Sequence, residues 1–126
     1  MAVTHSTAAR DAAANAVVDL LDAGTPPGSL VFLTSGDATV CSIAFETTAF
    51  GASSSAVATM AQGSGKTSNG ATAGTIAKVE FRNAAGTAVI FCAVATSGSD
   101  INIPGGLTLA TNVTVSITSL TYTAPA

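Results

Sequence analysis

The sequence predicts a mainly β protein: an antiparallel, jelly-roll-like β-sandwich of six to seven or more short strands with one N-terminal α-helix. Two observations predict this class. Beyond residue 28 the chain consists of short runs rich in Thr and Val, separated by Gly, Ser and Asn. Before residue 24, apolar residues instead recur every three or four positions, as in a helix. The 126 residues suit one folded unit, which we divide into a helical arm with a Pro-Pro-Gly hinge (1–28) and a sandwich domain (29–126).

The N-terminal helix is expected over Thr7–Ala23, with Ser6 or Thr7 as its cap and Gly24 at its end. Arg10 in its first turn and acidic residues near its last turn oppose the helix dipole, so the helix needs a surface to lie on. We expect an apolar stripe and an opposite polar stripe. The apolar stripe holds Ala9, Ala13, Val17 and Leu20 or Leu21, joined by Ala14 and Val18, and the polar stripe holds Asp11, Asn15, Asp19 and Asp22.

The first strands are expected at Ser29–Thr34 and Ala38–Phe45, joined in a hairpin by residues 35–37. A weaker strand is expected over Ser55–Ala61. Residues 63–70 are expected to form a loop because Gly occupies three of these positions.

The clearest strand signal covers Thr75–Asn83, where apolar and charged residues alternate. Ala77, Val79 and Phe81 point to one face, and Lys78, Glu80 and Arg82 point to the other, which we expect to be exposed. A turn at residues 84–86 leads into Thr87–Val94, which is apolar on both faces and is therefore expected to be a central strand. A second turn cluster follows at residues 96–100.

The last strand region, Asn112–Thr123, changes the parity of its apolar residues. Val113, Val115 and Ile117 occupy odd positions, whereas Leu120 and Tyr122 occupy even ones. A strand with a period of two cannot place all five on one face, so we expect a β-bulge or bend near Thr118 and Ser119.

The composition argues against several classes of function. Charged residues make up 9% of the chain, against about 25% in ordinary soluble domains. The net charge of −3 does not provide the basic footprint of a nucleic-acid-binding protein. His, Cys, Asp, Glu and Lys, which carry out most acid–base and nucleophilic chemistry, are scarce. We therefore expect a structural or binding protein, with no enzymatic activity, cofactor or metal.

The ends and the cysteines give three further expectations. The N-terminus shows neither the charge pattern nor the apolar region of a secretory signal, and the chain contains no apolar stretch long enough to span a membrane. Cys41 and Cys92 lie far apart in apolar runs, so we expect two reduced, buried thiols rather than a disulfide. No CxxC spacing or nearby His indicates a metal site.

Four candidate chemical features each have a simpler interpretation. Residues 63–68 resemble a phosphate-binding loop, but Met60 stands where the first Gly is required and no helix signal follows, so we expect a surface loop. His5 is expected to be exposed. Asp100 has no acidic neighbour for a Ca²⁺ site and is expected to cap a turn. Glu46 and Glu80 have the chemistry of a glycosidase pair, but the chain has no Trp and one Tyr to form a sugar platform.

Three segments resemble a family of short virion proteins from tailed bacteriophages and prophages. They are residues 94–103 (VATSGSDINI), 113–123 (VTVSITSLTYT) and 12–24 (AAANAVVDLLDAG). The resemblance covers about half of the chain, at its two ends, and its motifs are not catalytic. It implies a head protein of the decoration (cement) type, with no catalytic residues to transfer.

The sequence therefore predicts a protein of the phage head surface, made in the host cytoplasm, that cements the capsid by binding between major capsid subunits. We expect it to form a homo-oligomer, with a trimer favoured over a dimer. A tail, neck or fibre-base component and a host-surface or carbohydrate-binding module are the alternatives. The expected contact residues with the capsid or a neighbouring subunit are Val3, Ala9, Ala13, Val17, Leu20 and Leu21.

Overall fold

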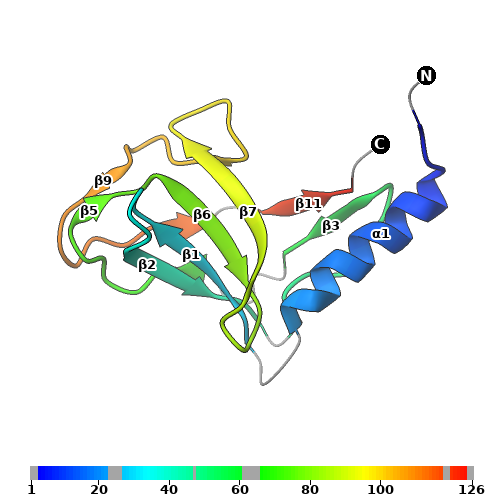
Figure 1. The fold of residues 1–126 in the computed structure, drawn as a ribbon, viewed down its shortest axis with the longest axis horizontal. Coiled ribbons are helices and arrows are strands. Elements are labelled where there is room, and N and C mark those ends of the chain that lie inside the picture. The colour runs from blue at the N-terminus through cyan, green and yellow to red at the C-terminus, as the bar shows by residue number, and fades with distance from the viewer. Residues whose placement is uncertain (1–2, 23–26, 47, 61–65, 118–119, 125–126) are drawn as a thin grey trace.

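The fold consists of two layers of β-structure and one helix (Figure 1). The computed structural model describes residues 3–22, 27–46, 48–60, 66–117 and 120–124. The first layer is a five-stranded sheet in the order β2-β1-β6-β7-β8. Its pairs are antiparallel except β7 with β8, which is parallel. The strands are β1 (Ser29–Leu33), β2 (Thr39–Ala44), β6 (Lys78–Arg82), β7 (Ala88–Ala95) and β8 (Ile101–Asn102).

The second layer consists of two two-stranded sheets assembled from distant parts of the chain, which we together call the ribbon. In it, β3 (Val57–Thr59) pairs with β11 (Thr121–Thr123), and β4 (Lys66–Thr67) pairs with β10 (Ser116–Ile117). A further pair, β5 (Gly74–Thr75) with β9 (Thr108–Leu109), lies at one end of the sheet (Figure 1). The predicted class, a mainly β sandwich with one N-terminal helix, is confirmed.

The core lies between the inner face of the sheet and the ribbon. Cross-strand neighbours Phe32, Val79 and Cys41 share one row of this face, and Leu30, Phe81 and Ile43 share the next. The rings of Phe45, Phe50 and Phe81 form a cluster with centroids 6.0–6.2 Å apart, an arrangement that stabilises cores beyond simple area burial.

Apolar residues of both parities in the last strand region pack against the core: Val115 and Ile117 at odd positions, Leu120 and Tyr122 at even ones. Val113, which was expected on the same face, is instead 42% exposed. The expected bulge at Thr118 and Ser119 lies outside the described residues.

Both predicted hairpins are present, and each turn has a local cause. In the β1–β2 turn, Asp37 adopts a φ of 69° and donates its N–H to the Thr34 carbonyl. In the β6–β7 turn, the Asn83 side-chain oxygen accepts the N–H groups of Ala85 and Thr87, while Gly86 adopts a φ of 85° that favours glycine.

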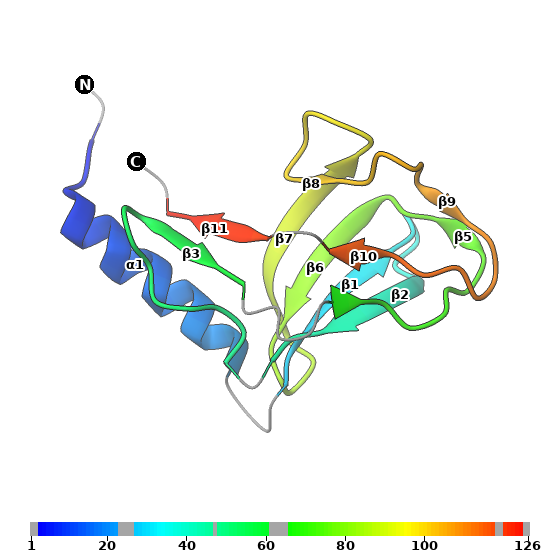
Figure 2. The same cartoon turned by 180° about the vertical axis from the view of Figure 1, so that it is seen from behind.

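Helix α1 (Thr7–Asp19) continues into a 3₁₀ turn (Leu20–Asp22) and lies along β3 and β11 (Figure 2). Ser6 is its N-cap, as predicted: the hydroxyl accepts the Ala9 N–H at 3.2 Å. Gly24 and Pro26 of the predicted helix end and hinge lie outside the described residues. Gly28, just before β1, has no room for a side chain, since a Cβ atom there would lie 2.4 Å from the Arg82 carbonyl oxygen.

Two predicted features of the strands differ from the structure, and a third agrees with it only in part. β4 and its pairing with β10 lie within the region predicted as a loop, because a two-residue strand leaves no periodic signal. The charged residues of β6 share one face, as predicted, but Glu80 and Arg82 are half-buried because they pair with each other. Finally, β7 lies between β6 and β8, as expected of a central strand, but β8 pairs with it only at Val94 and Ala95.

Candidate functional site

Helix α1 presents two different faces. Ala14, Val18 and Leu21 point toward the ribbon and are buried. Ala9, Ala13 and Leu20 lie on the opposite side and are exposed. In this single chain, the helix packs against β3 and β11 and leaves an apolar surface outward.

The polar residues of α1 hold it to the segment before β3. The Asp11 carboxylate accepts hydrogen bonds from the Ser53 hydroxyl and the Ala56 N–H, both at 2.7 Å. Asn15 accepts the Ser53 N–H at 2.8 Å, and Asp22 accepts the Ala49 N–H at 2.9 Å. The prediction that this polar stripe lies opposite the buried side of the helix is wrong: three of its four members border the buried face.

These hydrogen bonds also affect the ionisation of Asp11. Donation from Ser53, and then from Ala56, holds the pKa of the Asp11 carboxyl below its ordinary value, because both bonds favour the ionised form. Nearby Arg10 adds a smaller effect in the same direction.

Arg10 joins the start of the helix to the other end of the chain. Its guanidinium donates to the Ala124 carbonyl oxygen at 2.9 Å. Its buried Nε has no hydrogen-bond partner among the described residues. Arg10, whose positive charge near the start of the helix opposes the helix dipole, therefore holds α1 next to the end of β11.

The predicted contact residues fall into three groups by exposure. Val3 and Leu20 are 77% and 54% exposed, and Ala9 and Ala13 are exposed as well. Val17 is half-buried. Leu21 is 0% exposed and belongs to the core, so its inclusion in a contact surface is wrong. We define the outer stripe as Val3, Ala9, Ala13, Val17 and Leu20.

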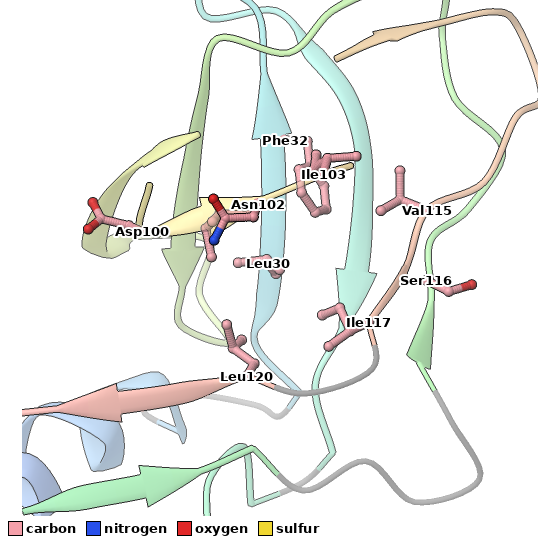
Figure 3. Close-up of a pocket in the computed structure, with 10 residues that line it drawn as sticks. Leu30, Phe32, Asp100, Asn102, Ile103, Val115, Ser116, Ile117 and Leu120 are labelled. Carbon is pink, nitrogen blue, oxygen red and sulfur yellow. The ribbon is translucent and has the colours of Figure 1, made fainter. Parts of the chain in front are cut away.

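A cleft that the sequence did not indicate lies between the two layers (Figure 3). Its volume is about 300 Å³, and Leu30, Phe32 and Ile103 surround its centre. A second cleft of about 370 Å³ continues it and shares Asp100, Ile101 and Leu120 with it. Residues of the sheet and of the ribbon line both clefts: β1 and β10 border the first, and β7 and β11 border the second.

The side chains of Cys41 on β2 and Cys92 on β7 lie in one row across the sheet, separated by Phe32 on β1 and Val79 on β6. Three strand spacings of about 4.8 Å each are too wide for a disulfide within one chain. Both thiols are free, as predicted, but Cys92 is half-buried rather than buried. Burial, followed by the Asp100 carboxylate, raises the pKa of Cys92 to about 11. Burial also raises the pKa of Cys41. These shifts make the thiols poor nucleophiles.

The remaining candidates do not form a reactive group. His5 is exposed before α1, whereas Cys41 is buried within the sheet. Glu80 forms an ion pair with Arg82 at 2.9 Å. Asp100 accepts the Ala93 N–H at 3.0 Å, in keeping with the predicted capping role. Of the phosphate-loop residues, Gly63, Ser64 and Gly65 lie outside the described residues, and a strand rather than a helix begins at Lys66.

The described regions hold no group of three or more His, Cys, Asp or Glu residues placed to bind a metal. None of the helices within them has the length and apolar character needed to cross a bilayer.

Comparison with known proteins adds no relationship: no protein family, curated protein or solved structure matches this chain.

Proposed function

We propose that this protein is a non-enzymatic structural component of a tailed-bacteriophage virion, which decorates the head and cements it by binding between major capsid subunits. The observation that carries the proposal is the exposed apolar outer stripe of α1. The resemblance of both ends of the sequence to short phage virion proteins supports it.

The outer stripe has properties that suit a repeated protein contact. Ala9, Ala13 and Val17 have small side chains that lose little rotamer entropy when they are covered. Leu20 and Val3 add larger apolar groups, which favour burial against a partner.

The stripe is also held in place before any partner binds. Ala14, Val18 and Leu21 anchor the helix from behind, and Asp11, Asn15 and Asp22 bond to the adjacent segment. A surface that is already ordered avoids the entropy cost of folding upon binding, which is the benefit of preorganisation.

Cementing follows from mass action. A protein that binds only the expanded shell stabilises that shell by an amount that grows with its free concentration relative to Kd. A homo-oligomer, with a trimer favoured, engages several capsid subunits at once, and this multiplies the effect through multivalency.

The test mixes the purified protein with expanded and unexpanded capsids and measures binding and heat resistance. We expect binding to expanded shells and a higher shell melting temperature. Leu20→Asp places a charge in the stripe and should weaken binding by about tenfold or more. Val113→Asp, at a residue that is 42% exposed and away from the stripe, is the control and should bind normally. Equal affinity for both shells without stabilisation contradicts the proposal.

Gold labelling of intact particles separates the proposal from its structural alternative. A decoration protein appears over the whole head, whereas a tail, neck or fibre-base component appears at one vertex or along the tail.

Phe91 favours the other alternative, a host-surface or carbohydrate-binding module, because its ring is 71% exposed. Aromatic rings of this kind stack on sugars, so the same preparation is screened for glycan binding with Phe91→Ala as control. Glycan binding that Phe91→Ala abolishes supports the module instead.

A further inference from the structure

Asn69 covers the outer edge of the five-stranded sheet. β2 is the end strand of that sheet, and its Ser42 forms two hydrogen bonds with Asn69. The Ser42 carbonyl oxygen accepts the Asn69 N–H at 3.1 Å, and the Asn69 Oδ1 accepts the Ser42 N–H at 3.0 Å. Thr72 continues the contact, since its N–H donates to the Val40 carbonyl oxygen at 2.8 Å. The segment 69–72 thus pairs with backbone groups that an edge strand otherwise leaves open to another chain.

Packing places a glycine directly after Asn69. Gly70 lies against Asn112, because a Cβ atom at residue 70 would lie 3.2 Å from the Asn112 Oδ1 and 3.3 Å from its Cα. These distances are shorter than an ordinary van der Waals contact, so a side chain at residue 70 is disfavoured. Gly70 is also exposed, and its N–H has no acceptor among the described residues. An unhindered, unpaired backbone nitrogen therefore follows the Asn69 side chain.

The side-chain carbonyl of Asn69 is polarised by the backbone. The Ser42 N–H that donates to Oδ1 stabilises the negative charge that develops on this oxygen when a nucleophile attacks Cγ. Within the part of the chain that the structure describes, the side-chain NH2 of Asn69 donates to no acceptor. The amide is therefore activated toward attack while its leaving group is unbound.

The peptide bond between Asn69 and Gly70 is polarised as well. The buried Ser68 hydroxyl donates to the Asn69 main-chain carbonyl oxygen at 2.9 Å and accepts the Val115 N–H at 2.8 Å. Hydrogen bonds in such a chain strengthen one another. Electron density drawn toward the carbonyl oxygen makes the Gly70 N–H more acidic, and the deprotonated nitrogen is the nucleophile that Asn69 requires.

We propose that Asn69 is a site of spontaneous covalent modification, at which the folded chain converts this asparagine to aspartate and isoaspartate without an enzyme. The Gly70 nitrogen loses its proton to hydroxide and attacks Cγ of Asn69. A new C–N bond closes a succinimide ring, and the bond from Cγ to Nδ2 breaks as ammonia leaves with a proton from water. Water then opens the ring at either carbonyl carbon. The net reaction consumes one water and releases one ammonia, with no oxidant or reductant.

The other asparagines lack this combination of features. Asn69 is the one asparagine in the sequence that precedes glycine. The backbone nitrogen after Asn102 belongs to Ile103, and its N–H donates to Ala95 at 2.9 Å. The side-chain NH2 of Asn102 also donates, to the Ser99 carbonyl oxygen at 3.1 Å. Asn102 is therefore an internal control with its nucleophile and its leaving group both bound.

Conversion changes the edge of the sheet. Either product adds one negative charge to a chain whose net charge is −3. Aspartate retains an oxygen that can accept the Ser42 N–H, whereas isoaspartate routes the main chain through its Cβ and displaces the residues that follow. We therefore expect the isoaspartate form to lose the contact between Thr72 and Val40. The inference concerns the chemistry of the chain itself and does not rest on the proposed function.

The first test compares conversion in folded protein and in protein unfolded with guanidinium chloride, at the same alkaline pH. Mass spectrometry of proteolytic peptides measures the replacement of NH2 by OH and separates the two isomers. We expect folded protein to convert Asn69 at about a tenth of the unfolded rate or faster, because a route through global unfolding is slower by about a thousandfold or more. A slower folded rate, or equal conversion of Asn102, overturns the proposal.

The second test separates the fold from the local sequence. Asn69→Gln keeps the amide but requires a larger ring, so it should form no acidic species on ion-exchange chromatography while the wild type does. Ser68→Ala removes the donor to the Asn69 carbonyl and should slow conversion severalfold in the folded state alone, whereas Ser68→Thr keeps the hydroxyl and the wild-type rate. Acidic species that form equally in Asn69→Gln, or equal rates in folded Ser68→Ala and wild type, overturn the proposal.

Ser68→Ala also removes the acceptor of the Val115 N–H, so a cooperative urea transition must verify that the variant folds. If it does not fold, the first test and Asn69→Gln decide the proposal. Failure of capsid binding affects neither test.

Discussion

The two faces of helix α1 have opposite relations to the rest of the molecule. The face toward the ribbon mixes apolar Val18 and Leu21 with Asp11 and Asn15, whose side chains bond to backbone N–H groups. The outward face is mostly alanine with Leu20 and makes no comparable bonds among the described residues. The difference teaches that polarity alone does not identify the solvent side of a short helix, because carboxylates and amides also serve to attach a helix to loops.

The largest difference in the free energy of unfolding is expected between alanine variants of the adjacent residues Leu20 and Leu21. Leu21→Ala removes a side chain that is 0% exposed, and should lower the free energy of unfolding by about 2–5 kcal/mol. Leu20→Ala, at a residue that is 54% exposed, should change it by no more than about 0.5 kcal/mol. Urea unfolding followed by circular dichroism measures both. Equal losses contradict the assignment of the two faces.

A moderate effect is expected from Asn15→Ala. The change leaves the Ser53 N–H without its acceptor, which costs about 1–3 kcal/mol. The higher helix propensity of Ala offsets about 0.5 kcal/mol of that loss. The net destabilisation is measured by the same urea titration. A variant as stable as the wild type shows that the bond does not hold the helix.

Acid pH tests the attachment through Asp11. The pKa of the Asp11 carboxyl is lower in the folded chain than in the unfolded chain. Its ionised form therefore contributes fully to the free energy of unfolding above the unfolded-state pKa, and this contribution disappears as the pH falls through the folded-state pKa. The urea midpoint of the wild type should therefore fall more steeply below about pH 5 than that of Asp11→Asn. Parallel profiles contradict this role.

The smallest effect on stability is expected for Ala13→Lys on the outward face. The free energy of unfolding should stay within about 0.5 kcal/mol of the wild type, because this side chain enters solvent. The same variant should bind expanded capsids less tightly if the outer stripe is the contact surface. A large loss of stability shows instead that this face is covered within the molecule.

The hydrophobic periodicity of the sequence predicted the structure correctly where one face of a helix or strand is buried. The alternation in Lys78–Arg82 correctly placed Val79 and Phe81 in the core and Glu80 on the other face. Ala77, which was predicted on the same face as Val79, is exposed because β6 begins only at Lys78. The position of Ser6 before an alanine-rich run correctly identified the start of α1. These features are local, so the residues that determine them are close in sequence.

The incorrect predictions concern contacts between segments that are distant in the sequence. The apolar composition of β7 indicated a central strand, but not that β8 would pair with it only at Val94 and Ala95. The spacing of Asp11 and Asn15 indicated a stripe, but not that Ser53 and Ala56 would lie beside it. For the same reason, the clefts were not predicted: residues that line them come from distant strands, such as Leu30 of β1 and Ile117 of β10.

The bond from Arg10 to Ala124 joins residues that are 114 positions apart in the sequence. Helix α1 packs against β3 and β11, which follow it by about 50 and 110 residues. The burial of Val18 and Leu21 in the core therefore depends on contacts between distant parts of the chain. Contacts of such high sequence separation form slowly, and a chain whose apolar residues stay uncovered in the meantime is prone to aggregation.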